Sequence, residues 1–113
     1  MKLIITTLGS YLTGDGIADA LLDYNHALSR ARATDLVDIP VVRDRETSRL
    51  RLTIGWLVQL HTLETTSDEP ELFAPATMMA LRARTARSVG GDSGAAGTLE
   101  SWLEDADLFE YGL

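Results

Sequence analysis

The sequence predicts an α+β fold, in which a small mixed sheet of three or four strands packs against one amphipathic helix. Two patterns support this prediction. Short β-branched and apolar segments are typical of strands, and one segment carries apolar residues at the three- and four-residue spacing of a helix that buries one face. The elements are expected in the order strand, helix, strand, strand, a further strand and helix, followed by an acidic C-terminal helix.

The first strand is expected over residues 2–8, which are mostly apolar or β-branched and end at Gly9. Gly9, Gly14 and Gly16 indicate a loop, after which the periodicity changes to that of a helix. Thr13 or Asp15 is expected to cap this helix. Its apolar face comprises Ile17, Ala20, Leu21, Tyr24, Ala27, Leu28 and Ala31.

A hairpin is expected next. Residues 35–42 are β-branched, and Pro40 indicates an edge or a bulge. The charged residues 43–47 would turn the chain back into a third strand, in which Leu50, Leu52 and Ile54 alternate with Arg49, Arg51 and Thr53. Gly55 is expected to mark a bend, a bulge or a break before a fourth strand that contains His61.

The second helix is expected to start near Pro70, because Asp68 and Glu71 have the spacing of a capping box, and to continue over residues 76–88. Four glycines in residues 90–97 indicate a flexible linker. We therefore expect one α+β domain over residues 1–89, a linker over 90–97 and an acidic amphipathic segment over 98–113.

The composition excludes several classes of protein. The 113 residues, 45% apolar and 24% charged, suit one globular domain. A net charge of −7 argues against nucleic-acid binding, and no apolar run approaches the roughly 18 residues that span a bilayer. There is no cysteine to form a disulfide or a thiolate ligand. The low Lys content, with Lys2 alone, suggests a GC-rich bacterial genome, and we expect a cytoplasmic protein without cofactor or metal.

One candidate ligand site lies at the expected loop, because a glycine-rich turn before a helix can present free amides to an anion or a nucleotide. Its residues would be Gly9, Ser10, Thr13, Gly14, Asp15 and Gly16. The loop matches no phosphate-binding fingerprint, and its acids would repel phosphate. The simpler interpretation is that the glycines permit a tight loop.

No catalytic residues can be assigned. Asp15, Asp19, Asp23 and His26 share one side of the helix, but residues four apart rise about 6 Å per step and do not converge on one ion. We interpret this row as a solvated face and His61 as structural. Enzyme activity stays open, although a non-enzymatic role is the stronger expectation.

The C-terminal segment is the most distinctive feature. Residues 92–113 hold six acids and no base. Five residues at helical spacing would form its binding face: Leu99, Trp102, Leu103, Ala106 and Phe109. This face would cover Trp56 or Leu57 of its own domain, or bind a second copy or a basic partner; mimicry of nucleic acid is a weaker alternative. The leading hypothesis is a protein-interaction or regulatory module, with a homodimer as one form it could take.

Overall fold

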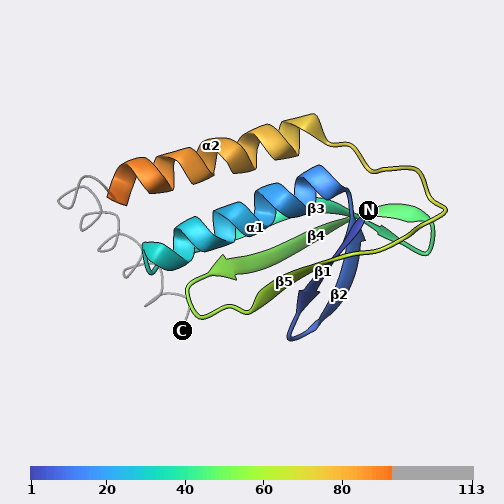
Figure 1. Cartoon of the computed structure of the whole chain (residues 1–113), viewed down its shortest axis with the longest axis horizontal. Coiled ribbons are helices and arrows are strands. Elements are labelled where there is room, and N and C mark those ends of the chain that lie inside the picture. Colours follow the sequence, from blue (N-terminus) through green and yellow to red (C-terminus); the bar gives the residue numbers. More distant parts are fainter. Residues whose placement is uncertain (93–113) are drawn as a thin grey trace.

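The computed structural model describes residues 1–92 as a five-stranded sheet with two helices (Figure 1). The elements are β1 (Lys2–Thr6), β2 (Gly9–Thr13), α1 (Asp15–Arg30), β3 (Thr34–Arg43), β4 (Glu46–Gly55), β5 (Leu60–Glu64) and α2 (Pro75–Asp92). The α+β class is confirmed. The sheet has the order β4-β3-β2-β1-β5, and all neighbouring strands are antiparallel. The expectation of a mixed sheet of three or four strands is therefore wrong, as is the expected element order.

The additional strand is β2, which occupies most of the expected glycine loop. It pairs with β1 along its whole length, from Lys2 opposite Thr13 to Thr6 opposite Gly9. The two-residue turn between them is held by the Thr6 hydroxyl, which donates to the Gly9 carbonyl at 3.2 Å and accepts from the Leu8 amide. A side chain thus stabilises this turn, which is why the absence of typical turn residues at positions 7 and 8 does not prevent it.

Helix α1 covers one face of the sheet, and its predicted apolar face is largely confirmed. Its buried residues are Ile17, Ala18, Ala20, Leu21, Tyr24, Asn25, Ala27 and Leu28. They pack against Ile4 of β1, Val37 and Ile39 of β3 and Ile54 of β4. The predicted inward alternation of β4 is also present, since Ile54 is buried and Leu50 and Leu52 are half-buried.

Two groups of strands meet at a narrow joint. The β3–β4 hairpin has ten register pairs, whereas β2 and β3 share a single one, Leu12 opposite Val42. The buried Thr13 hydroxyl adds a hydrogen bond to the Pro40 carbonyl at 2.8 Å. Because this joint is short, the helix that packs across both groups supplies much of their connection.

The C-terminal end of α1 is tied to the end of β4. The Gly55 amide donates to the buried Asn25 side-chain oxygen at 2.7 Å, and the Trp56 amide donates to the Ala33 carbonyl at 2.9 Å. Gly55 has φ +116°, and a Cβ there would lie 2.3 Å from the Ala33 oxygen. Only glycine fits this position. At Gly55 the end of β4 therefore comes close to the Ala33 backbone and bonds to Asn25 of α1.

The second helix starts at Pro75, five residues later than expected, and residues 65–74 form a non-helical connection. Pro75 suits the first turn because its missing amide is not needed there. Helix α2 lies beside α1 and runs in the same direction (Figure 1). It continues to Asp92, within the expected linker. The rest of that linker and residues 98–113 lie outside the described residues.

The tie between Asn25 and Gly55 predicts a large effect of a small substitution. Asn25→Ala leaves the Gly55 amide buried without an acceptor, which costs about 1–3 kcal/mol of unfolding free energy. Urea denaturation measures this loss. The neighbouring exposed substitution His26→Ala is the control and is expected to change stability by less than about 0.5 kcal/mol. Equal stability of the two variants would contradict the role given to Asn25.

The β3–β4 turn predicts a stabilising substitution. Asp44 and Arg45 both have positive φ, 51° and 64°, as in the type I′ turn that joins hairpins. Glycine adopts the second of these positions without the steric cost that a Cβ brings. Arg45→Gly is expected to raise the unfolding free energy by about 0.5–1 kcal/mol, whereas Arg43→Gly, within β3, is expected to lower it. A thermal or urea melt of both variants tests the pair.

Candidate functional site

The N-terminal end of α1 is capped by a distant residue. Gly14 is the N-cap and makes no side-chain capping bond, so the expected cap by Thr13 or Asp15 is wrong. Instead, the Asp15 amide donates to both carboxylate oxygens of Glu71 at 3.3 Å. The carboxylate thus occupies the position at a helix N-terminus that an anionic ligand would take.

The Met1 ammonium completes this cluster. It lies 2.9 Å from Asp15 Oδ1 and 3.5 Å from Glu71 Oε1. The hydrogen bond to Asp15 raises the pKa of the ammonium, and the same bond lowers the pKa of the Asp15 carboxyl. The ammonium therefore offsets part of the negative charge that Asp15 and Glu71 place at this end of α1.

The structure does not bring the six residues of the candidate ligand site together. Gly9 and Ser10 begin β2, and four extended residues place Gly9 about 13 Å from Thr13. A Cβ on Gly14 would lie 2.0 Å from the Leu72 carbonyl oxygen, and one on Gly16 would lie 2.6 Å from Met78 Cε. These two glycines therefore allow the 65–74 connection and α2 to approach α1. A ligand at this loop remains a prediction.

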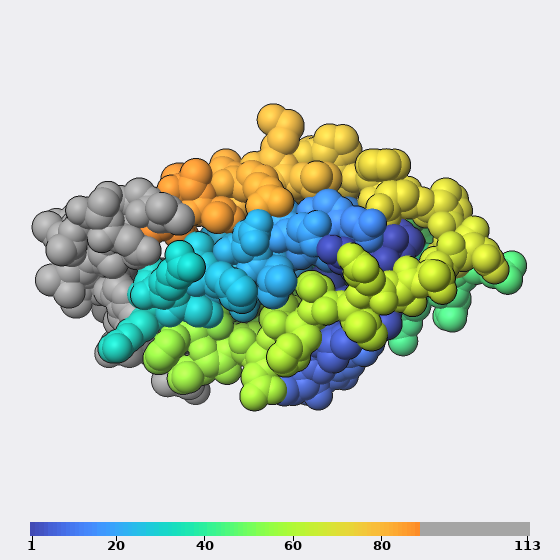
Figure 2. Space-filling view, in the orientation of Figure 1, coloured from blue at the N-terminus to red at the C-terminus, as the bar shows by residue number. Residues whose placement is uncertain are grey.

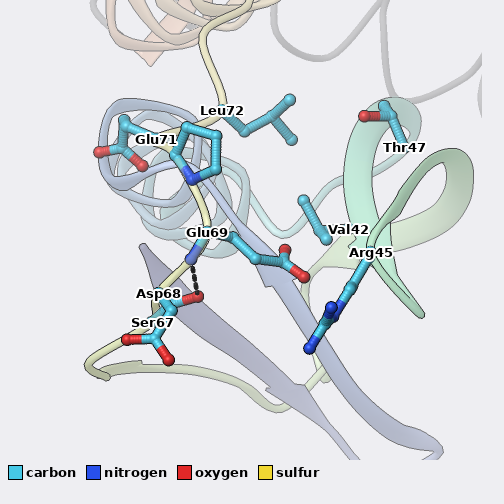
Figure 3. Close-up of a pocket in the computed structure, with 9 residues that line it drawn as sticks. Val42, Arg45, Thr47, Ser67, Asp68, Glu69, Glu71 and Leu72 are labelled. Carbon is cyan, nitrogen blue, oxygen red and sulfur yellow. Dashed lines mark hydrogen bonds between the residues drawn. The ribbon is translucent and has the colours of Figure 1, made fainter.

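A hollow of about 670 Å³ lies between the β3–β4 hairpin and residues 67–72 (Figure 3). Arg45 and Glu69 extend toward one another from its two sides, and Asp68 and Glu71 add further acids. Within residues 1–92, no three His, Asp or Glu side chains are grouped so that they could hold a metal ion. The hollow is a polar surface depression between two parts of the fold.

The acidic residues on one side of α1 form ion pairs, so the expectation of a solvated face is only partly met. Asp19 accepts from Lys2 Nζ at 2.6 Å, and Asp23 pairs with Arg82 of α2. His26 is exposed. The carboxylates thus connect α1 to β1 and α2, although ion pairs as exposed as these contribute little stability each.

A second polar cluster, not expected from the sequence, joins three elements. The Tyr24 hydroxyl of α1 donates to Asp35 Oδ2 of β3 at 2.6 Å, and Arg84 of α2 donates to the same oxygen at 3.0 Å. Burial raises the pKa of Tyr24, and the bond to Asp35 adds to the shift. The hydroxyl therefore remains protonated and acts as a donor that joins α1 to β3, while Arg84 joins α2 to the same carboxylate.

The clearest unpartnered surface is on the face of the sheet opposite α1. We call it the open-face patch and define it as Leu3, Ile5, Leu12 and Leu63. Leu3 is paired with both Leu12 and Leu63, while its neighbour Ile4 is buried under α1. Because successive strand residues alternate between faces, the four side chains share the outer face. Leu63 is 54% exposed, and the other three are half-buried.

Comparison with protein-family models, with curated proteins and with solved structures finds no match for this chain. Within residues 1–92, neither helix is long and apolar enough to cross a membrane. The expected binding residues Leu99, Trp102, Leu103, Ala106 and Phe109 lie outside the described residues. The function is therefore inferred from this chain's own surfaces.

The Met1 cluster predicts a pH dependence of stability. Folding raises the pKa of the ammonium above its ordinary value of about 8, so its contribution is full below that pH and is lost as the pH rises through the higher folded value. The urea midpoint is expected to fall between pH 7 and 9.5. Asp15→Asn removes the main partner and should flatten this fall, whereas Asp44→Asn, in the β3–β4 turn, should leave it unchanged.

Proposed function

We propose that this protein is a small non-enzymatic interaction module that binds a second copy of itself through the open-face patch, with residues 98–113 as a further interaction element. The open-face patch is the observation that carries this proposal. Burial of apolar surface in an interface stabilises the complex by about 25 cal/mol for each Å² removed from water, so an exposed apolar patch on a sheet face favours association.

The polar residues on the same face favour a second copy as the partner. Ser10 and His61 are paired with Ile5 and thus lie beside the patch, and neither is an Asp, Glu, Lys or Arg residue. Although the chain has a net charge of −7, two such faces can approach without like charges meeting at the centre. A two-fold dimer places the same patch on both sides of the interface.

The position of the patch also supports this proposal. It spans β2, β1 and β5, three strands with continuous pairing, whereas both helices lie on the other side of the sheet (Figure 1). Strand β5 is the edge of the sheet in the described part of the chain. A partner on this face would therefore contact a surface already ordered by its own hydrogen bonds, which lowers the entropic cost of association.

A charge within the patch is expected to break the association. Leu63→Arg places a charge where two copies would meet, and we expect the dimer dissociation constant to rise at least about 10-fold, as burial of an unpaired charge requires. Sedimentation equilibrium of the full chain measures it. Met79→Arg is the matched control, because Met79 is also an exposed apolar residue but lies on α2.

Two results would contradict the proposal. One is a wild-type chain that stays monomeric up to about 200 µM, a concentration at which even weak specific dimers are populated. The other is equal dissociation constants for the two variants. Circular dichroism of each variant separates a lost interface from a lost fold.

A further inference from the structure

A second exposed surface lies at the C-terminal end of α1. We call it the end patch and define it as Arg30, Arg32, Trp56 and Leu57. The Arg32 guanidinium carbon lies 5.5 Å from the centre of the Trp56 ring, within the range of a cation–π contact. Trp56 is 40% exposed and Leu57 is 84% exposed. The patch thus combines apolar area with positive charge.

Two residues of the end patch have large side chains at backbone positions that favour glycine. Arg32 and Leu57 have φ values of 53° and 65°, a left-handed conformation that costs a residue with a Cβ about 1–2 kcal/mol. Arg32 occupies the position of a helix-ending motif in which glycine is usual, with the Ala33 amide bonded to the Leu28 carbonyl. Glycine or asparagine would satisfy both turns, so neither turn requires the exposed side chain of Leu57.

The chain leaves α2 close to this patch. Arg82 of α2 pairs with Asp23 of α1, and the two helices run in the same direction (Figure 1). Seven residues further along each helix, at the common rise of about 1.5 Å per residue, Arg30 is level with residue 89. Helix α2 ends at Asp92. The five residues 93–97 can then bridge up to roughly 20 Å to residue 98.

The charges of the two parts are complementary. All ten basic residues fall within residues 1–92, whereas residues 93–113 hold five acids and no base: Glu100, Glu104, Asp105, Asp107 and Glu110. Among the described residues, neither Arg30 nor Arg32 has a carboxylate within ion-pairing distance. Both Arg side chains are exposed. Figure 2 shows the last turn of α1 and the residues that follow it, in cyan, at one end of the described part of the chain.

We propose that residues 98–113 bind to the end patch of their own chain. Apolar residues of the segment, Trp102 and Phe109 among them, would cover Trp56 and Leu57, while its carboxylates would pair with Arg30 and Arg32. The proposal deepens the role given to residues 98–113 as an interaction element. It does not depend on the open-face patch, so each experiment can fail without the other.

Disulfide trapping in the full chain tests the proposal directly, because the native sequence has no cysteine. Leu57→Cys with Ala106→Cys joins the end patch to the segment. Ala86→Cys with Ala106→Cys is the control for simple tethering, since Ala86 is exposed near the end of α2 but outside the patch. Under mild oxidation, the first pair is expected to form an intramolecular disulfide about 10-fold faster, reflecting its higher effective concentration.

A charge reversal provides the second arm. Arg30→Glu with Arg32→Glu should slow trapping of the 57/106 pair at least several-fold, whereas Arg43→Glu with Arg45→Glu, at the β3–β4 turn, should not change it. Equal trapping rates for the 57/106 and 86/106 pairs overturn the proposal. A disulfide-linked dimer in place of the intramolecular product also overturns it, because the segment would then bind a second copy.

Discussion

The buried face of α1 is the constraint on which the rest of this structure depends. The β3–β4 hairpin and the β2-β1-β5 strands share only the pair of Leu12 and Val42, a joint too short to fix their relative position by backbone hydrogen bonds. Ile17, Leu21 and Leu28 are almost fully buried, and burial of each side chain contributes about 1.5–3 kcal/mol. Because α1 contacts β1 and β5 as well as β3 and β4, and its buried side chains belong to one core cluster with theirs, the helix joins two weakly paired groups of strands into one core.

Both ends of α1 are completed by residues far away in the sequence. Glu71 satisfies the first amide of the helix, and Gly55 donates to Asn25 near the last turn. The 65–74 connection is therefore bonded to the start of α1 through Glu71, and α2 is bonded through Arg84 to Asp35, which also accepts from Tyr24 of α1. Gly14 and Gly16 allow this packing, because a Cβ at Gly14 would collide with the Leu72 carbonyl of the connection and a Cβ at Gly16 with Met78 of α2.

The sequence predicts what periodicity determines and misses what distant contacts determine. The face of α1 and the alternation of Leu50, Leu52 and Ile54 follow from spacing alone. Strand β2 is missed because its turn is closed by the Thr6 hydroxyl and because Gly9 resembles a strand terminator. The capping-box spacing of Glu71 is local, yet its carboxylate binds another helix. The open-face patch depends on the register of three strands, which no single segment encodes. Its sequence signal is the unbroken apolar run Leu3, Ile4 and Ile5, because consecutive strand residues point to opposite faces and such a run places apolar side chains on both.

The distribution of charge connects the two proposed surfaces. Residues 1–92 carry 10 bases and 12 acids, a net charge of −2, so the remaining −5 belongs to residues 93–113. Free acidic segments on two copies would repel each other and oppose association through an uncharged patch. Bound to Arg30 and Arg32, the same carboxylates would be partly neutralised at the end of α1, away from the outer face of β1. Occupancy of the end patch would therefore favour pairing of the open faces without any contact between the two sites.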